Sequence, residues 1–251
     1  MFLSRLSLFC LCLLSSSYLS AAEPNEPLTV SFATESNYYP FEYLNEKQEL
    51  QGFDIDIANA ICQAVNLSCS FHPQSFDSLL LTLQFGRFDA VIAALDITDE
   101  RKEKVDFSDS YYKNPPVFVS KKSSSDDFSI AGKFIGVKAN TSNQNYLIRY
   151  AKEDSFIISY LTVSDALIDL KNGKIDGAFA DHAVVADFLK QEDNEKYFSI
   201  RRIEDMFMRK FSEGYGIAVK KGNDQLRERL NLGLKIIIEN GTYQKIYDLY
   251  F

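Results

Sequence analysis

The chain has 251 residues, with 27 Lys and Arg against 35 Asp and Glu, and a formal net charge of −8. An acidic chain with scattered lysines is not typical of nucleic-acid-binding proteins, so the sequence argues against that class. The length suffices for one large domain or two smaller ones, and 20 Phe and 14 Tyr can build a core without any Trp.

The N-terminal segment, residues 1–22, has the pattern of a cleaved signal peptide. Arg5 precedes an apolar run over residues 6–14, and serines and small residues follow it up to Ala22. The run is too short to span a bilayer as a helix, so a membrane anchor is the weaker alternative. We expect cleavage after Ala22, with Ala21 as second choice, and export of a chain without a lipid anchor.

Processing at that site leaves two cysteines, Cys62 and Cys69. An even number of cysteines in an exported chain predicts a disulfide, here between a helix end and the next strand. Two free buried thiols are the alternative. We expect no metal site, because His72 and His182 form no ligand cluster with these cysteines. We assign no role to His182.

The first half of the exported chain alternates strands and helices. Residues 28–34 read as a strand and residues 41–50 as a hairpin. Further strands are expected over residues 68–72 and 117–120, and helices from Gly52 and over residues 76–85. Asp54 and Asp56 open the first helix. They could form a catalytic carboxylate pair, but helix capping and dipole complementarity are the favoured explanation.

Residues 88–101, FDAVIAALDITDER, are the most informative stretch. The apolar run over residues 90–95 predicts a strand buried on both faces, within an expected strand over residues 88–95. It is followed by Asp96 and then Arg101. Ligands of open α/β sheets bind beyond the carboxyl ends of the strands. An acid and a base at this point can hold the opposite charges of one small molecule, and we expect a free amino acid.

The second half restarts the same pattern. Strands are expected over residues 134–138, 156–160, 175–180 and 214–219, and helices up to Tyr150 and over residues 164–171, 224–240 and 241–250. Residues 80–89 (LLTLQFGRFD) also match residues 167–176 (LIDLKNGKID) at Leu, Leu, Gly and Asp positions. The match is either an internal repeat or only the usual order of helix, glycine and strand. Both interpretations predict two βα lobes of similar build.

The fold class that follows is α/β, with two lobes that are each a mainly parallel sheet flanked by helices. We expect a first lobe over residues 23–114 and 211–251, and a second lobe over residues 115–210. The chain then crosses between the lobes twice, near residues 113–116 and 206–214, which gives a two-strand hinge.

Five segments together resemble the periplasmic polar-amino-acid-binding proteins of ABC importers (solute-binding protein family 3), and among them most of all the arginine-binding branch. They are residues 52–62 (GFDIDIANAIC), 76–83 (FDSLLLTL), 88–101, 168–185 (IDLKNGKIDGAFADHAVV) and 241–251 (GTYQKIYDLYF). The resemblance covers nearly all of the exported chain. It implies the type II periplasmic binding protein fold, in which ligand binds between two hinged lobes.

The resemblance also implies roles for individual residues. Arg101 pairs with the ligand α-carboxylate, which a guanidinium matches bidentately. Ser142 donates to the same carboxylate at a helix start, beside Asn143. Asp181 accepts from the α-ammonium, and Asp96 adds a second acceptor. Ala94 and Leu95 complete the strand end before Asp96.

The far end of the ligand is expected to meet three further residues. Tyr38 and Phe76 sandwich its side chain, and Glu35 meets its distal positive charge. Each has a plain alternative: Phe76 as core, Tyr38 packed on Pro40, and Glu35 as a solvated loop acid. Arg101 and Asp181 could instead form a structural ion pair. Ala93 stands where some lysine/ornithine/histidine binders carry serine, which is a departure from their pattern.

We therefore expect a monomeric periplasmic binding protein that captures a basic L-amino acid, arginine above all, and delivers it to an ABC transporter permease. It needs no cofactor and no catalysis. The alternative is a periplasmic cyclohexadienyl (arogenate or prephenate) dehydratase of the same fold, whose site should be richer in cations. A module that serves a sensor or a host surface is a third possibility.

Overall fold

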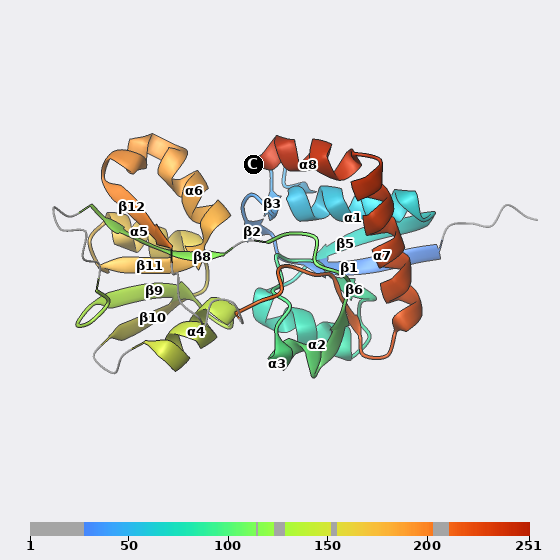
Figure 1. Cartoon of the computed structure of the whole chain (residues 1–251), viewed down its shortest axis with the longest axis horizontal. Helices are drawn as coiled ribbons and strands as arrows, with labels where there is room; N and C mark the ends of the chain where they lie inside the picture. Colours follow the sequence, from blue (N-terminus) through green and yellow to red (C-terminus); the bar gives the residue numbers. More distant parts are fainter. Residues whose placement is uncertain (1–27, 114, 123–128, 152–154, 203–210) are drawn as a thin grey trace, which may run out of the picture.

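Two α/β lobes make up the protein in the computed structural model, side by side along its longest axis (Figure 1). The structure describes residues 28–113, 115–122, 129–151, 155–202 and 211–251. The expected signal peptide lies outside these ranges, and so does most of the second expected crossover. The lobe boundaries given above therefore stay a prediction. Within the described ranges, no helix is long and apolar enough to cross a membrane.

The first lobe is built on a five-stranded sheet of order β5-β1-β6-β13-β7. Strands β5, β1 and β6 are parallel, and β13 runs antiparallel to both β6 and β7. The strands are β1 (Leu28–Thr34), β5 (Leu67–Pro73), β6 (Ala90–Val91), β7 (Val105–Phe107) and β13 (Ala218–Lys220). A small sheet beside it contains β2 (Asn37–Tyr38), β3 (Glu42–Leu44) and β4 (Leu50–Gln51).

Helices cover both faces of the first sheet (Figure 1). One face carries α1 (Phe53–Ala64), α7 (Asp224–Glu239) and α8 (Thr242–Tyr250), and the other carries η1 (Phe76–Ser78), α2 (Leu79–Gln84) and α3 (Asp99–Lys102). Neighbouring strand residues alternate between the two cores: Phe32 packs with Ile57 and Ile61 of α1, and Ala33 with Leu83 of α2. This two-sided burial explains why the strands read as nearly continuous apolar runs.

The second lobe repeats this plan with the order β10-β9-β11-β8-β12. Strands β10, β9 and β11 are parallel, and β8 is antiparallel to β11 and β12. Its strands are β8 (Pro116–Lys121), β9 (Phe134–Lys138), β10 (Phe156–Tyr160), β11 (Gly177–Asp181) and β12 (Phe198–Arg202). Its helices are α4 (Ser142–Tyr150), α5 (Val163–Lys171), α6 (His182–Lys190) and η2 (Gln191–Lys196).

The sequence match between the halves has a structural counterpart. Asp89 accepts from the backbone N–H of Ser31 in β1, and Asp176 accepts from the N–H of Phe134 in β9, each at 2.8 Å. The matched Gly86 and Gly173 both adopt positive φ, 70° and 73°, at the end of their helices. The two lobes therefore share both strand order and these joints, as an internal repeat would predict.

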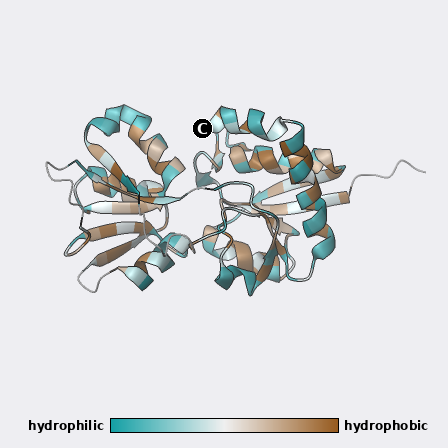
Figure 2. Ribbon diagram, viewed as in Figure 1, coloured by the Kyte–Doolittle hydropathy of each residue, from teal (hydrophilic) through white to brown (hydrophobic). Residues whose placement is uncertain are grey.

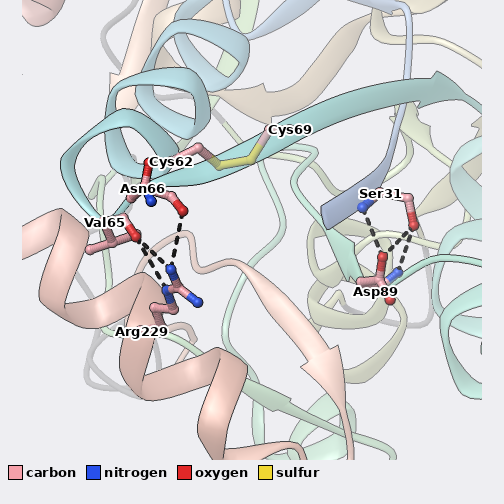
Figure 3. Close-up of a disulfide and its surroundings, with 7 residues drawn as sticks. All are labelled: Ser31, Cys62, Val65, Asn66, Cys69, Asp89 and Arg229. Carbon is pink, nitrogen blue, oxygen red and sulfur yellow. Dashed lines mark hydrogen bonds between the residues drawn. A yellow bond between two sulfur atoms is a disulfide. The ribbon is translucent and has the colours of Figure 1, made fainter. Parts of the chain in front are cut away.

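Apolar residues line the inner faces of the helices and most of both sheets, whereas polar residues lie on the outer helix faces (Figure 2). The expected disulfide is present between Cys62, in the last turn of α1, and Cys69 in β5 (Figure 3). Arg229 of α7 donates to the carbonyls of Val65 and Asn66 in the loop that the disulfide closes. These contacts fix the turn between α1 and β5.

Two expected strands are shorter in the structure. The strand over residues 88–95 is reduced to Ala90–Val91, although residues 90–95 are buried as predicted. Ala94 adopts φ 44°, which turns the chain out of the strand geometry before Asp96. The strand over residues 214–219 begins only at Ala218, and Tyr215 forms isolated bridges to Asp96 and Tyr112 instead.

Candidate ligand-binding site

A small cavity lies between the two lobes, where their central strands end. Its volume is about 10 Å³, room for about one water molecule, so the lining side chains nearly fill the space between the lobes. The first lobe contributes Tyr38, Phe76, Ala93, Ala94, Asp96 and Arg101, and the second contributes Lys138, Thr141, Ser142, Asn143 and Asp181. Because most of these side chains are polar or charged, the cavity suits a small polar ligand rather than an apolar one.

The cavity brings together most of the residues that the sequence predicts for ligand binding. Two of the predicted residues, Leu95 and Glu35, do not line the cavity themselves. Leu95 is 1% exposed and packs in the core beneath α2. Glu35 is 5% exposed and reaches the cavity through its ion pair with Lys138.

Arg101 is positioned by the short helix α3. Thr98 caps this helix by accepting from the N–H of Arg101, which fixes the backbone from which the side chain extends. The guanidinium Nη1 donates to the carbonyl of Asp96 at 3.0 Å, and the guanidinium carbon is 5.8 Å from the centre of the Phe76 ring. Burial lowers the pKa of Arg101, and the nearby Asp96 opposes that shift. A half-buried guanidinium held this way can accept a ligand carboxylate.

Asp181 ends strand β11 and faces the first lobe. One carboxylate oxygen accepts from the hydroxyls of Tyr38 and Tyr215, the latter at 2.6 Å. The other oxygen accepts from the amide of Asn143 at 3.1 Å. Burial, and then the charge of Asp181, raise the pKa of Tyr38 and Tyr215 well above the ordinary value, so both hydroxyls keep their protons and donate. Asp181 therefore accepts hydrogen bonds from residues of both lobes, across the cavity.

Asp96 is the second acid of the cavity, and its hydrogen-bond donor, Ser142, also lies on the other side of the cavity. Its carboxylate accepts from the hydroxyl of Ser142, the first residue of α4. Burial, and then the charge of Asp181, raise the pKa of Asp96 to about 6. The two acids thus repel each other in a buried space, which a positive ligand group would relieve.

Lys138 is a cavity residue that the sequence analysis did not select. It ends strand β9, is 3% exposed and forms an ion pair with Glu35 of the first lobe. Its ammonium nitrogen is 4.5 Å from the ring centre of Tyr38 and 4.4 Å from that of Phe76. The predicted aromatic pair and the predicted distal acid therefore do converge, and they converge on a cation of the protein itself.

Asp54 supports the cavity from behind. It is fully buried in the first turn of α1, and its carboxylate accepts from the N–H of Ala94 at 2.6 Å and from the hydroxyl of Tyr111 at 2.8 Å. The hydrogen bond from the N–H of Ala94 supports the positive-φ conformation of this residue, two positions before Asp96. Burial raises the pKa of Asp54 to about 6, and these two hydrogen bonds oppose the shift.

The capping interpretation of Asp54 and Asp56 is wrong, since α1 has no side-chain cap hydrogen bond and its N-cap residue is Gly52. Both acids do lie in the first turn, where the helix dipole favours negative charge. Asp56 instead accepts from the hydroxyl of Tyr250 in α8. Asp54 therefore supports the cavity, whereas Asp56 contacts the C-terminal helix α8.

The sequence over residues 30–251 matches the model of the bacterial extracellular solute-binding proteins, family 3. The chain belongs to this family. Among curated relatives of this solute-binding protein, the putative ABC transporter arginine-binding protein 2 of Escherichia coli is 40% identical over 89% of this chain and 90% of its own length. The arginine-binding periplasmic protein of Mannheimia haemolytica is 41% identical, over 85% of this chain and 87% of its own.

A solved structure gives the same result for the fold. An ancestral arginine-binding protein bound to arginine is 35% identical to this solute-binding protein and aligns with a TM-score of 0.80, over 90% of this chain and 99% of its own. The two-lobed periplasmic binding protein fold is thereby confirmed. These relatives carry the names of binding proteins for transport, so the protein is a binding protein, and the dehydratase alternative is not favoured.

The missed residue, Lys138, had a signal in the sequence. It is the last residue of an expected strand, four positions before Ser142, and ligands bind beyond such strand ends. From the sequence alone, a lysine at this strand end could be exposed to solvent or paired with an acid of the other lobe. The fold decides for the pair, because it brings Glu35, more than one hundred positions earlier in the chain, next to Lys138.

Proposed function

We propose that this solute-binding protein captures a free L-amino acid with a basic side chain, arginine before other basic amino acids, between its two lobes. The observation that supports it best is that Arg101 of one lobe and Asp181 of the other line the same cavity. A cation and an anion that face one small space match the α-carboxylate and α-ammonium of an amino acid. In this proposal Ser142 and Asn143 assist at the start of α4, where N–H groups favour an anion.

The charge of the cavity supports a basic ligand. Arg101 and Lys138 face Glu35, Asp96 and Asp181, which gives one excess negative charge once Asp96 is ionised. A ligand with one net positive charge neutralises this excess in a buried space, where an unpaired charge is costly. The names of the arginine-binding relatives point the same way.

We further propose where the protein works and with which partner. The N-terminal segment over residues 1–22 directs export and is removed, and the product acts as a monomer in the periplasm. Ligand binding favours the closed arrangement of the lobes. The closed protein then presents both lobes to the membrane permease of an ABC importer.

Calorimetric titration of the purified protein with the common amino acids tests this function. Co-purified ligand is first removed by unfolding in guanidinium chloride and refolding. We expect arginine, or another basic amino acid, to bind with a Kd in or below the micromolar range. If no basic amino acid binds more tightly than the neutral and acidic ones, the proposal is rejected.

A further inference from the structure

Lys138 places its ammonium group where the proposed function puts the side-chain cation of the ligand. Its ammonium group lies near the faces of Tyr38 and Phe76 and forms an ion pair with Glu35. The side chains of Lys138 and Glu35 are 4% and 7% exposed, so water screens this pair little.

The three contacts of Lys138 are the contacts that a ligand cation needs. An aromatic pair and a carboxylate can bind either an ammonium or a guanidinium, by charge and by cation–π attraction. Two cations cannot share them without strong repulsion at this distance in a buried site. The ligand cation therefore binds here only if Lys138 gives up part of its contacts.

The backbone restricts how far Lys138 can withdraw. The residue ends strand β9, where Val137 pairs with Phe179 of β11, and its carbonyl accepts from the hydroxyl of Thr141 at 2.7 Å. The backbone is thus fixed, and only the side-chain torsions can move the ammonium group.

We propose that Lys138 is a specificity-determining residue, which competes with the side-chain cation of the ligand for Glu35, Tyr38 and Phe76. This inference rests on the proposed function and deepens it. Lys138 weakens the binding of every ligand with a side-chain cation. It has no such effect on a neutral side chain of equal length, whose carbonyl can accept from Lys138 while its N–H groups donate to Glu35.

Arginine and citrulline test this competition, because they have the same length and citrulline carries a neutral ureido group in place of the guanidinium. Both are titrated calorimetrically into the wild type and into Lys138→Met, which removes the charge and keeps an unbranched side chain. We expect the ratio of the arginine Kd to the citrulline Kd to fall about tenfold in the variant.

Lys190→Met is the matched control, because it removes one exposed lysine from the last turn of α6. Its ratio should equal that of the wild type. Circular dichroism and thermal melting verify folding. If Lys138→Met does not fold, Lys138→Gln replaces it, since glutamine can still hydrogen-bond to Glu35.

Each outcome decides between the proposals. A fall of about threefold or more in the ratio supports the competition, and a smaller fall or a rise overturns it while leaving amino-acid binding intact. If the wild type binds no amino acid at all, the proposed function fails, and the competition fails with it.

Discussion

The charge of Asp96 in the cavity changes with a moderate change of pH, because burial and the charge of Asp181 raise its pKa to about 6. A bound positive ligand group favours its ionised form and so lowers this pKa again. Protons therefore compete with the ligand as the pH falls through 6. We expect the Kd for arginine to rise by up to about tenfold between pH 7 and pH 5.

Calorimetry across this pH range measures the effect, and Asp96→Asn provides the control. The variant should bind arginine more weakly at pH 7 and lose most of the pH dependence. An arginine Kd in the wild type that is constant from pH 7 to pH 5 would show that Asp96 does not sense the ligand.

Arg101 is expected to pair with the α-carboxylate of the ligand, and a ligand without that group tests this role. Agmatine is arginine that lacks the carboxylate. A hydrogen bond to a charged group contributes about 1.5–3 kcal/mol, so Arg101→Lys should weaken arginine binding by roughly 10- to 150-fold. The same substitution should leave agmatine binding nearly unchanged.

Titration of both ligands into both proteins completes this double-difference experiment. Equal losses for arginine and agmatine would assign Arg101 to the cavity structure rather than to the carboxylate. The structural ion pair considered for Arg101 would predict that result, although in this structure the guanidinium donates to the carbonyl of Asp96.

At the scale of elements, the loop between β6 and α3 depends on a carboxylate from another helix. Asp54 of α1 accepts from the N–H of Ala94 and from the hydroxyl of Tyr111, and all three residues are buried. Asp54→Ala leaves two buried donors without this acceptor. At about 1–3 kcal/mol for each donor, we expect the free energy of unfolding to fall by about 2–6 kcal/mol.

Urea denaturation measures this loss, and Asp56→Ala is the matched control from the same turn of α1. Asp56 accepts one hydrogen bond, from Tyr250, so its removal should cost only about 1 kcal/mol. Arginine binding should also weaken in Asp54→Ala, because Ala94 and Asp96 line the cavity. Equal stability of the two variants would remove the support role of Asp54.

The elements that the sequence predicted well are those with a clear period. The strand over residues 28–34 and the helix over residues 224–240 agree with β1 and α7 to within one residue. The strand over residues 88–95 was too long, because the apolar residues 92–95 stay buried after the strand has ended at Val91. A run of apolar residues indicates burial, and a buried loop behind a ligand site has the same run of apolar residues as a buried strand.

The positions of cavity residues were predictable where they follow a strand end, and less so where they depend on a distant partner. Asp96, Arg101 and Asp181 were found from their place after apolar runs, and the structure brings them to one cavity. Lys138 and Asp54 were missed or misjudged, because their partners lie at Glu35 and Ala94, far away in sequence. No local pattern reveals a contact between two lobes.

At the scale of the whole molecule, the charged contacts join the lobes across the cavity. Tyr38 and Tyr215 donate to Asp181, Ser142 donates to Asp96, and Lys138 pairs with Glu35, in each case between a residue of the first lobe and one of the second. A ligand that adds contacts to both lobes shifts the balance toward this closed arrangement. Binding and closure are therefore coupled through the same few side chains.

The central claim is that one amino acid bridges Arg101 and Asp181 in the space between the lobes, and a crystal structure of the protein grown with L-arginine tests it most directly. We predict electron density for one amino acid in the cavity, with its α-carboxylate on Arg101 and its α-ammonium on Asp181. A closed cavity without ligand density, or an arginine bound elsewhere on the surface, would contradict this account.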